Sequence, residues 1–195
     1  MNKREFLAGA ALGAAALAGP AHAAPRALSS PPLLTITGAI GRGNRGALDP
    51  ALDQLMNKQG IRFDKGHAFD FASLAALPTV TIRPTLEYDG KRHALRGPLL
   101  TDVLAAAGVR QGKVELVMRA IDGYAPAVML ADVRKYRFIV ATHLDGKPMP
   151  LGGLGPLWAI FDADRFAEIA GRPLNDRFGN CPWGLYHIDV REVRA

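Results

Sequence analysis

The chain has 195 residues, of which 49% are hydrophobic and 22% are charged, and its formal net charge is +6. This length predicts one domain with a sizeable core, and the ordinary composition excludes a chain that is disordered throughout. The positive charge is modest and scattered, with no cluster of lysine and arginine, so nucleic acid is not expected as a partner.

The N-terminus has the pattern of an export signal. Lys3 and Arg4 precede the apolar run FLAGAALGAAALAG, and Ala21-His22-Ala23 fits a small-x-small cleavage site. The apolar run is shorter than the ~20 residues that a membrane-spanning helix needs, so we expect no stable membrane insertion. Residues 1–23 therefore predict a cleaved signal peptide, by the Sec or the twin-arginine route, and a protein located in the periplasm.

A flexible leader and a single domain are expected after the signal. Residues 24–32 are rich in Ala, Ser and Pro, and residues 33–195 are expected to form the domain. LLTITGAI (33–40) alternates apolar and small residues, as a half-buried strand does. The following GRGNRG (41–46) lacks the established phosphate-binding patterns, which leaves open a plain connection or an anion-binding loop.

Three segments predict helices. Residues 49–60 offer Asp49 as the N-cap, a proline at the first helical position and Gly60 as the terminating residue. Residues 69–78 predict a short helix or turn that ends at a proline. In LLTDVLAAAG (99–108) the apolar residues recur on one helical face, and the final glycine suits the position after a helix.

The other ordered segments predict strands. They are VTIRPTLEYDG, VELVMRAIDGY, VMLADV, YRFIVATHLDGKPMPL with an Asp-Gly turn, GPLWAIFDAD and WGLYHIDVREV. Strands outnumber helices and are not separated by regular helices. The sequence therefore predicts an α+β domain with mixed or largely antiparallel sheets.

Motifs for metal binding or hydrolysis are missing from the sequence. No pair of histidines or cysteines has the spacing of a zinc site, and the Gly-x-Ser-x-Gly pattern is absent. Cys181 is the only cysteine, so an intramolecular disulfide is impossible and a buried thiol is the expected state.

The order of the segments resembles a known family. LTITGAI, FDFASLAALP, TLEYDG, GPLLTDVLAAAG, AIDGY, DVRKYRFIVATHLDGKPMP, GPLW and WGLYHIDV follow one another as in small exported proteins of the sulfite-oxidase-like fold. These proteins are known as oxidoreductase molybdopterin-binding domains. The resemblance covers residues 33–193 and implies a largely β, α+β fold with a cleft that holds a pterin.

The expected molybdenum ligand is absent from the position that the family implies. In catalytic members, a cysteine in the strand-and-turn segment before the GPLL-like helix coordinates the metal. Here Thr85 or a neighbour stands at that place, and Cys181 lies far away in the sequence. A threonine hydroxyl is a poor substitute for the soft, anionic sulfur that molybdenum requires in this class.

The resemblance extends to a subset of the family that lacks this cysteine. Such proteins bind reduced pterins in the periplasm and contact the periplasmic domain of an inner-membrane signalling enzyme of cyclic-dinucleotide metabolism, thereby influencing biofilm formation. The resemblance thus implies a non-catalytic pterin-binding protein. One alternative is an oxidoreductase that uses the molybdenum cofactor with an unusual ligand set or a partner subunit. Another is an interaction module with an empty cleft.

Candidate ligand contacts follow from this resemblance and from the chemistry of a flat heterocycle. Such a ligand needs stacking surfaces and hydrogen-bonding groups along its edge. A carboxylate suits an aminopyrimidinone because it accepts from two adjacent N–H donors. The expected edge contacts are Arg83, Thr85 and Asp122, the expected stacking residues are Tyr88, Tyr124 and Trp183, and the expected close backbone walls are Gly153 and Gly155.

The chain departs from its relatives in the loop that holds these two glycines. It has Gly152-Gly153-Leu154 where relatives often carry the charged Arg-Asp-Lys. The loss of a basic group would weaken the binding of a phosphorylated pterin more than that of an uncharged one.

Overall fold

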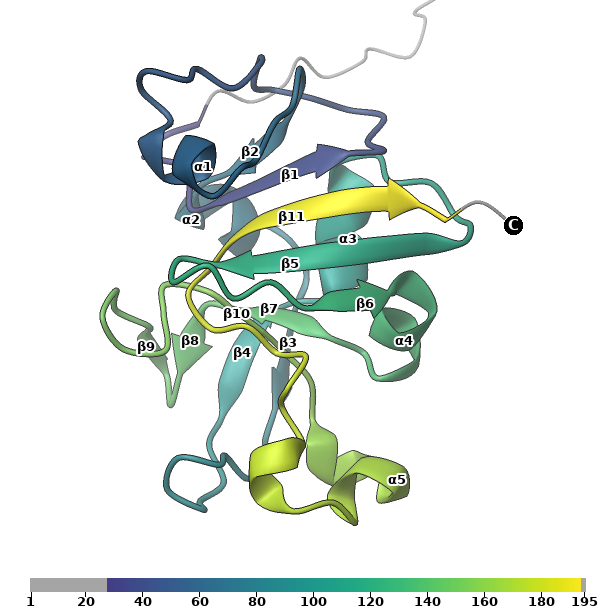
Figure 1. Cartoon of the computed structure of the whole chain (residues 1–195). Coiled ribbons are helices and arrows are strands. Elements are labelled where there is room, and N and C mark those ends of the chain that lie inside the picture. The colour runs from purple at the N-terminus through teal and green to yellow at the C-terminus, as the bar shows by residue number, and fades with distance from the viewer. Residues whose placement is uncertain (1–27, 194–195) are drawn as a thin grey trace, which may run out of the picture.

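A computed structural model describes residues 28–193 of the chain (Figure 1). The predicted signal peptide lies outside the described residues. The largest sheet has five strands in the order β2-β1-β11-β5-β6. Its strands are β1 (Leu34–Gly38), β2 (His67–Phe69), β5 (Val114–Ala120), β6 (Ala127–Met129) and β11 (Leu185–Glu192). The β1–β11 pair is parallel and the other pairs are antiparallel, so the first strand of the domain lies beside the last.

Two smaller sheets lie below the five-stranded sheet in Figure 1. One has the order β3-β4-β8-β9 and the other pairs β10 with β7. Their strands are β3 (Thr79–Ile82), β4 (Leu95–Pro98), β7 (Ile139–Ala141), β8 (His143–Leu144), β9 (Lys147–Pro148) and β10 (Trp158–Ile160). The helices are α1 (Gln54–Lys58), α2 (Phe71–Ala75), α3 (Leu100–Ala106), α4 (Leu130–Lys135), α5 (Ala167–Ala170) and the 3-10 turns η1 (Ala163–Arg165) and η2 (Leu174–Asp176). This arrangement is the α+β class that the sequence predicts.

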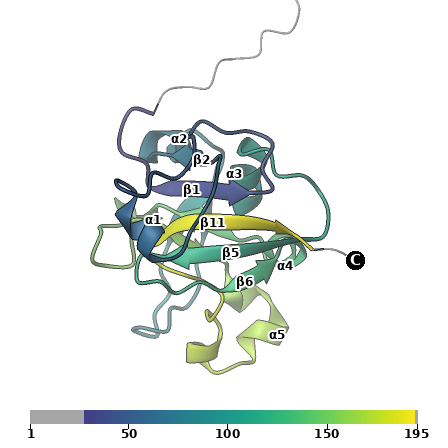
Figure 2. The same ribbon diagram turned by 45° about the horizontal axis from the view of Figure 1, so that its top comes forward.

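The core forms where alternating strand residues meet helix α3. Leu34 and Ile36 of β1 and Ile188 of β11 point to the same cluster as Leu100 and Val103 of α3, and all are fully buried. Burial of each side chain of this size stabilises the folded state by on the order of 2 kcal/mol. The turned view shows α3 behind the five-stranded sheet and α1 toward the viewer (Figure 2).

Helix α1 covers a small second cluster. Met56 and Ile61 pack with Tyr186 of β11, apart from the main core. The Asp49 side chain accepts from the backbone N–H groups of Ala51 and Leu52, as an N-cap does. The predicted helix over 49–60 is nevertheless shorter in the structure, because Asp53 has a non-helical ψ of 50° and α1 begins only at Gln54. Gly60 ends it with φ of 73°, as expected.

The predicted strand over 128–133 is wrong beyond Met129. The chain turns into helix α4 at Leu130, and Leu130 and Val133 bury one side of its first turn. Three-residue spacing of apolar side chains suits a helix as well as a short strand, and here the helix packs against β5, β6 and α3.

The Asp-Gly turn after β8 has the structure that its sequence predicts. Asp145 and Gly146 have φ of 48° and 81°, and they join β8 to β9 as a two-residue hairpin. Among the described residues, no helix is long and apolar enough to cross a membrane.

Candidate functional site

A cavity of about 310 Å³ lies where three segments of the chain meet. The segments are the loop after β3, the turn after β5 and the stretch that leads into β11. Its walls are formed by Glu87, Tyr88, Ala120, Asp122, Tyr124, Asn175, Phe178, Gly179, Cys181, Pro182 and Trp183. Its volume is at the lower end of the range for small-molecule sites. Four of the eight predicted contacts, Tyr88, Asp122, Tyr124 and Trp183, are therefore brought together here.

Three aromatic side chains form the rim of this cavity. Tyr88, Tyr124 and Trp183 are 55%, 49% and 39% exposed, although side chains of this size usually bury most of their surface. The Tyr124 hydroxyl donates to the backbone oxygen of Gly179, which ties the turn after β5 to the stretch before β11. Exposed, tethered aromatic rings at a cavity mouth provide surfaces on which a flat ligand can stack.

The charged side chains in the walls are both acidic. Glu87 and Asp122 contribute carboxylates and Asn175 contributes an amide, and no lysine, arginine or histidine lines the cavity within the described residues. One Asp122 oxygen accepts from the backbone N–H of Tyr124 at 2.9 Å, which leaves its other oxygen for a ligand. The pKa of Tyr88 is raised by burial and by the charge of Glu87. The site therefore favours N–H donors and disfavours anions.

Cys181 lies in the wall of the same cavity. Its position near the C-terminus suggested that it was remote, but the stretch before β11 brings it to Glu87 and Tyr88. The predicted burial is confirmed, since Cys181 is 3% exposed. Burial raises the pKa of its thiol well above the ordinary value, and the negative charge of Glu87 raises it further.

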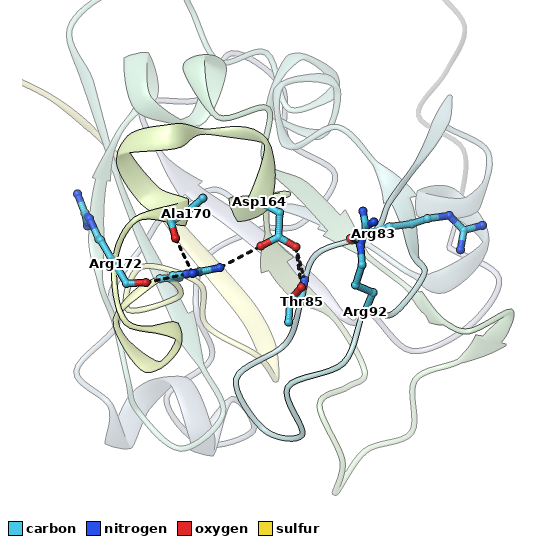
Figure 3. A network of polar contacts seen from close by, with 7 residues as sticks. Arg83, Thr85, Arg92, Asp164, Ala170 and Arg172 are labelled. Carbon is cyan, nitrogen blue, oxygen red and sulfur yellow. Dashed lines mark hydrogen bonds and ion pairs between the residues drawn. The ribbon is translucent and has the colours of Figure 1, made fainter.

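Thr85 and Arg83 lie outside the cavity walls. Thr85 donates its backbone N–H and its hydroxyl to one oxygen of Asp164, both at 2.8 Å, as Figure 3 shows. The backbone oxygen of Arg83 accepts from the side chain of Arg92 at 3.0 Å, and the Arg83 residue is exposed. These contacts fix the loop that carries Glu87 and Tyr88. Thr85 and Arg83 therefore position two wall residues without lining the cavity themselves.

The predicted glycine walls also lie elsewhere. A Cβ on Gly155 would come within 2.5 Å of the backbone oxygen of Met149, so this glycine is required for chain packing. Gly153 is exposed and has room for a side chain. Neither glycine lines the 310 Å³ cavity.

Sequence reasoning missed Glu87, Asn175 and Cys181. Glu87 follows Thr85 closely in the loop, and its neighbour Tyr88 was recognised as an aromatic candidate. Asn175 and Cys181 belong to an irregular stretch without a local pattern, and only the long-range contacts of that stretch bring them to the site.

Two larger cavities have less suitable walls. One of about 400 Å³ is lined by glycine-rich loops and the end of β11, and it has no aromatic wall. Another of about 380 Å³ includes Tyr136 and Phe161, but these rings already pack on each other at 5.1 Å between centroids. Its Arg177 is engaged by Asp164, Arg172 and Ala170.

The residues of the site do not fit a thiolate-bound metal. The Thr85 hydroxyl is engaged by Asp164, and the raised pKa of the Cys181 thiol opposes the thiolate that a soft metal requires. Within residues 28–193, no group of three or more His, Cys, Asp or Glu side chains is arranged to hold a metal ion. A phosphate-bearing cofactor would also face two carboxylates here.

Comparison with known proteins supports the fold. No protein-family model matches the chain, and no curated protein matches it significantly. Among solved structures, it is similar to the sulfane dehydrogenase SoxCD from Paracoccus pantotrophus, with a TM-score of 0.54 and 14% identity. The match covers 82% of this chain and 38% of that chain, so the present chain spans less than half the length of its neighbour. At this identity the likeness shows a shared fold, and the expected sulfite-oxidase-like α+β fold is confirmed.

Proposed function

We propose that this protein binds an uncharged reduced pterin in the cavity between Tyr88, Asp122 and Trp183, without turning it over. The observation that carries the proposal is the composition of the walls, which have an aromatic rim, two carboxylates and, within residues 28–193, no basic side chain. A pterin offers a flat face for the rings and adjacent N–H donors for a carboxylate.

The charge of the walls selects against phosphorylated forms of the ligand. Glu87 and Asp122 both line the cavity, and an anionic group placed near either would be repelled. The ligand class is therefore a pterin with a short polar side chain and without phosphate.

The absence of a suitable nucleophile or metal ligand in the cavity supports binding without catalysis. Among the described wall residues there is no serine or threonine hydroxyl, and burial raises the pKa of the one thiol, that of Cys181, which keeps it protonated. A binder changes a partner only through its different affinity for two states. We propose that the exported protein reports pterin occupancy to the periplasmic domain of an inner-membrane enzyme of cyclic-dinucleotide metabolism, and so acts on biofilm formation.

Titration of the mature protein with dihydroneopterin and with its triphosphate tests the binding proposal. We expect saturable binding of dihydroneopterin with a Kd of about 10 μM or below, and binding of the triphosphate that is at least about tenfold weaker. Asp122→Asn should weaken dihydroneopterin binding by about tenfold, because the amide oxygen stays bonded to the Tyr124 N–H and the other position then presents an NH2 group to the N–H donors of the ligand. Asp64→Asn removes an exposed carboxylate that lies outside the cavity walls and serves as the matched control.

Each result of this titration decides the proposal. Absence of saturable binding, or Asp122→Asn binding as tightly as the wild type, would overturn it. Preference for the triphosphate would show that the ligand lies in another part of the molecule. The alternative of a molybdenum-dependent oxidoreductase predicts stoichiometric molybdenum in protein taken from its native cells, and the wall chemistry predicts none.

A further inference from the structure

We infer that Asp164 and Arg177 are positioning residues that set the distance between two walls of the cavity. This inference rests on the proposed function. Neither residue lines the cavity, but each holds a segment that does. Asp164 lies in η1, and its two carboxylate oxygens bond to different segments of the chain.

One carboxylate oxygen of Asp164 holds the loop after β3. Its Oδ2 atom accepts from the backbone N–H and the hydroxyl of Thr85 (Figure 3). Leu86 follows as a buried residue, and its N–H donates to the oxygen of Lys91 at 2.9 Å to close the loop. Glu87 and Tyr88 stand next in this loop, so their place in the cavity wall depends on the Thr85 anchor.

The other oxygen of Asp164 holds the stretch before β11. Its Oδ1 atom accepts from the Arg177 guanidinium at 3.0 Å. Arg177 also donates to the backbone oxygens of Arg172 at 3.0 Å and Ala170 at 2.5 Å, so its side chain is fixed in one orientation. The neighbouring residues Asn175, Phe178, Gly179 and Cys181 form the second wall.

The base of this connection is rigid. Ala163 and Phe161, just before Asp164, are buried in the main core. Asp164 and Arg177 are themselves only 24% and 18% exposed in their side chains, which limits screening of their ion pair by solvent. Loss of either partner therefore loosens a wall, which then keeps only its other attachments, such as the bond from the Trp158 indole to the Cys181 backbone oxygen. Ligand binding must then order the loosened wall at the expense of affinity.

Affinity for dihydroneopterin in matched variants tests the inference. Asp164→Asn should raise Kd about tenfold, since an amide cannot accept on both sides. Arg177→Gln should raise Kd similarly, and the double variant should be within about twofold of either single variant because both changes break one connection. Thr85→Val should weaken binding, whereas Thr85→Ser, which keeps the hydroxyl, should bind as the wild type does.

Asp70→Asn provides the control for stability alone. Asp70 is a buried aspartate that, like Asp164, accepts several hydrogen bonds, and it lies outside the cavity walls. It should lower Tm and leave Kd unchanged. An unchanged Kd in Asp164→Asn would contradict the inference, as would an equal loss of affinity in Asp70→Asn or a failure of Thr85→Ser to retain binding.

Hydrogen exchange in the absence of ligand separates this inference from the proposed function. The amides of Leu86 and Cys181 are hydrogen-bonded within the two walls, to Lys91 and Phe178. In Asp164→Asn both should exchange at least about tenfold faster, even if no pterin binds to the wild type. Faster exchange in only one wall, or in neither, would show that Asp164 does not link them.

Discussion

The indole N–H of Trp158 donates to the backbone oxygen of Cys181 at 2.8 Å, and this bond fixes the only cysteine of the chain against the buried strand β10. A backbone bridge between Trp158 and Trp183 continues the same contact. The cavity wall is therefore attached to the core at the position of the thiol, which has a direct chemical consequence.

We predict that Cys181 reacts slowly with thiol reagents. Burial and the charge of Glu87 both raise the pKa of the thiol, so little thiolate is available at pH 8. The rate of reaction with a disulfide reagent should be at least about a hundredfold lower in the native protein than in urea. A native rate close to that of the unfolded chain would show that the Cys181 thiol is accessible and partly ionised, and therefore able to bind a metal.

Acid should destabilise the protein through His187. This residue is 2% exposed, its Nε2 atom lies 2.9 Å from the hydroxyl of Thr37, and burial lowers its pKa to about 4. A histidine whose pKa is lowered by folding stays neutral in the native state but is protonated in the unfolded chain near 6.5, so stability is lost as the pH falls below that value. The loss from pH 7 to pH 5 should be about 2 kcal/mol.

The pKa of His187 can be measured by following the ring proton signals in an NMR titration. A midpoint near 4 supports the buried, neutral imidazole. A midpoint at or above 6 would show that the ring is hydrated or paired with an acid, and the predicted loss of stability would then be absent.

Gly97→Ala should strongly destabilise the fold. A Cβ at this position would come within 1.9 Å of the backbone oxygen of Val140, where β4 crosses β7. The backbone cannot yield without separating the two strands, so we expect a loss of at least about 3 kcal/mol in urea unfolding, or insoluble protein. Gly46→Ala, at a glycine with nothing within 4 Å, should change stability by less than about 0.5 kcal/mol. Equal stability of the two variants would contradict the close strand packing.

Asp70→Asn should lower Tm by at least about 2 °C. Asp70 accepts from the backbone of Ser73 through Oδ1, and from Ser29 and Ser30 through Oδ2. An asparagine keeps the first bond and places an amide against the other donors. The bonds from Ser73 and Ser29 hold the pKa of Asp70 well below its usual range, so its contribution is present above pH 3.8 and is lost as the pH falls through the lowered value. A thermal melt of the variant that matches the wild type at pH 7 would contradict this.

Local patterns predicted the elements that local interactions determine. The strand at 34–38, helix α3 with its terminal glycine and the β8–β9 turn all match the sequence expectation. The prediction of a strand at 130–133 is wrong, because its apolar spacing is compatible with both helix and strand, and the helix that forms packs against β5, β6 and α3. Such a choice depends on residues far away in the chain.

The site could be predicted only in part for the same reason. The family resemblance and the chemistry of a flat ligand together pointed to Tyr88, Asp122, Tyr124 and Trp183, which meet in one cavity. Arg83 and Thr85 were expected to contact the ligand, but the structure places them in the network behind the wall. Their role there depends on Asp164, which is distant in sequence and has no motif of its own.

The most direct test of pterin binding without molybdenum is mass spectrometry of the small molecules that co-purify with the mature protein from its native cells. The metal content is measured on the same sample. We predict a stoichiometric pterin without phosphate and without molybdenum. Molybdenum bound to a pyranopterin would contradict it, because the cavity offers two carboxylates and no available sulfur ligand within the described residues.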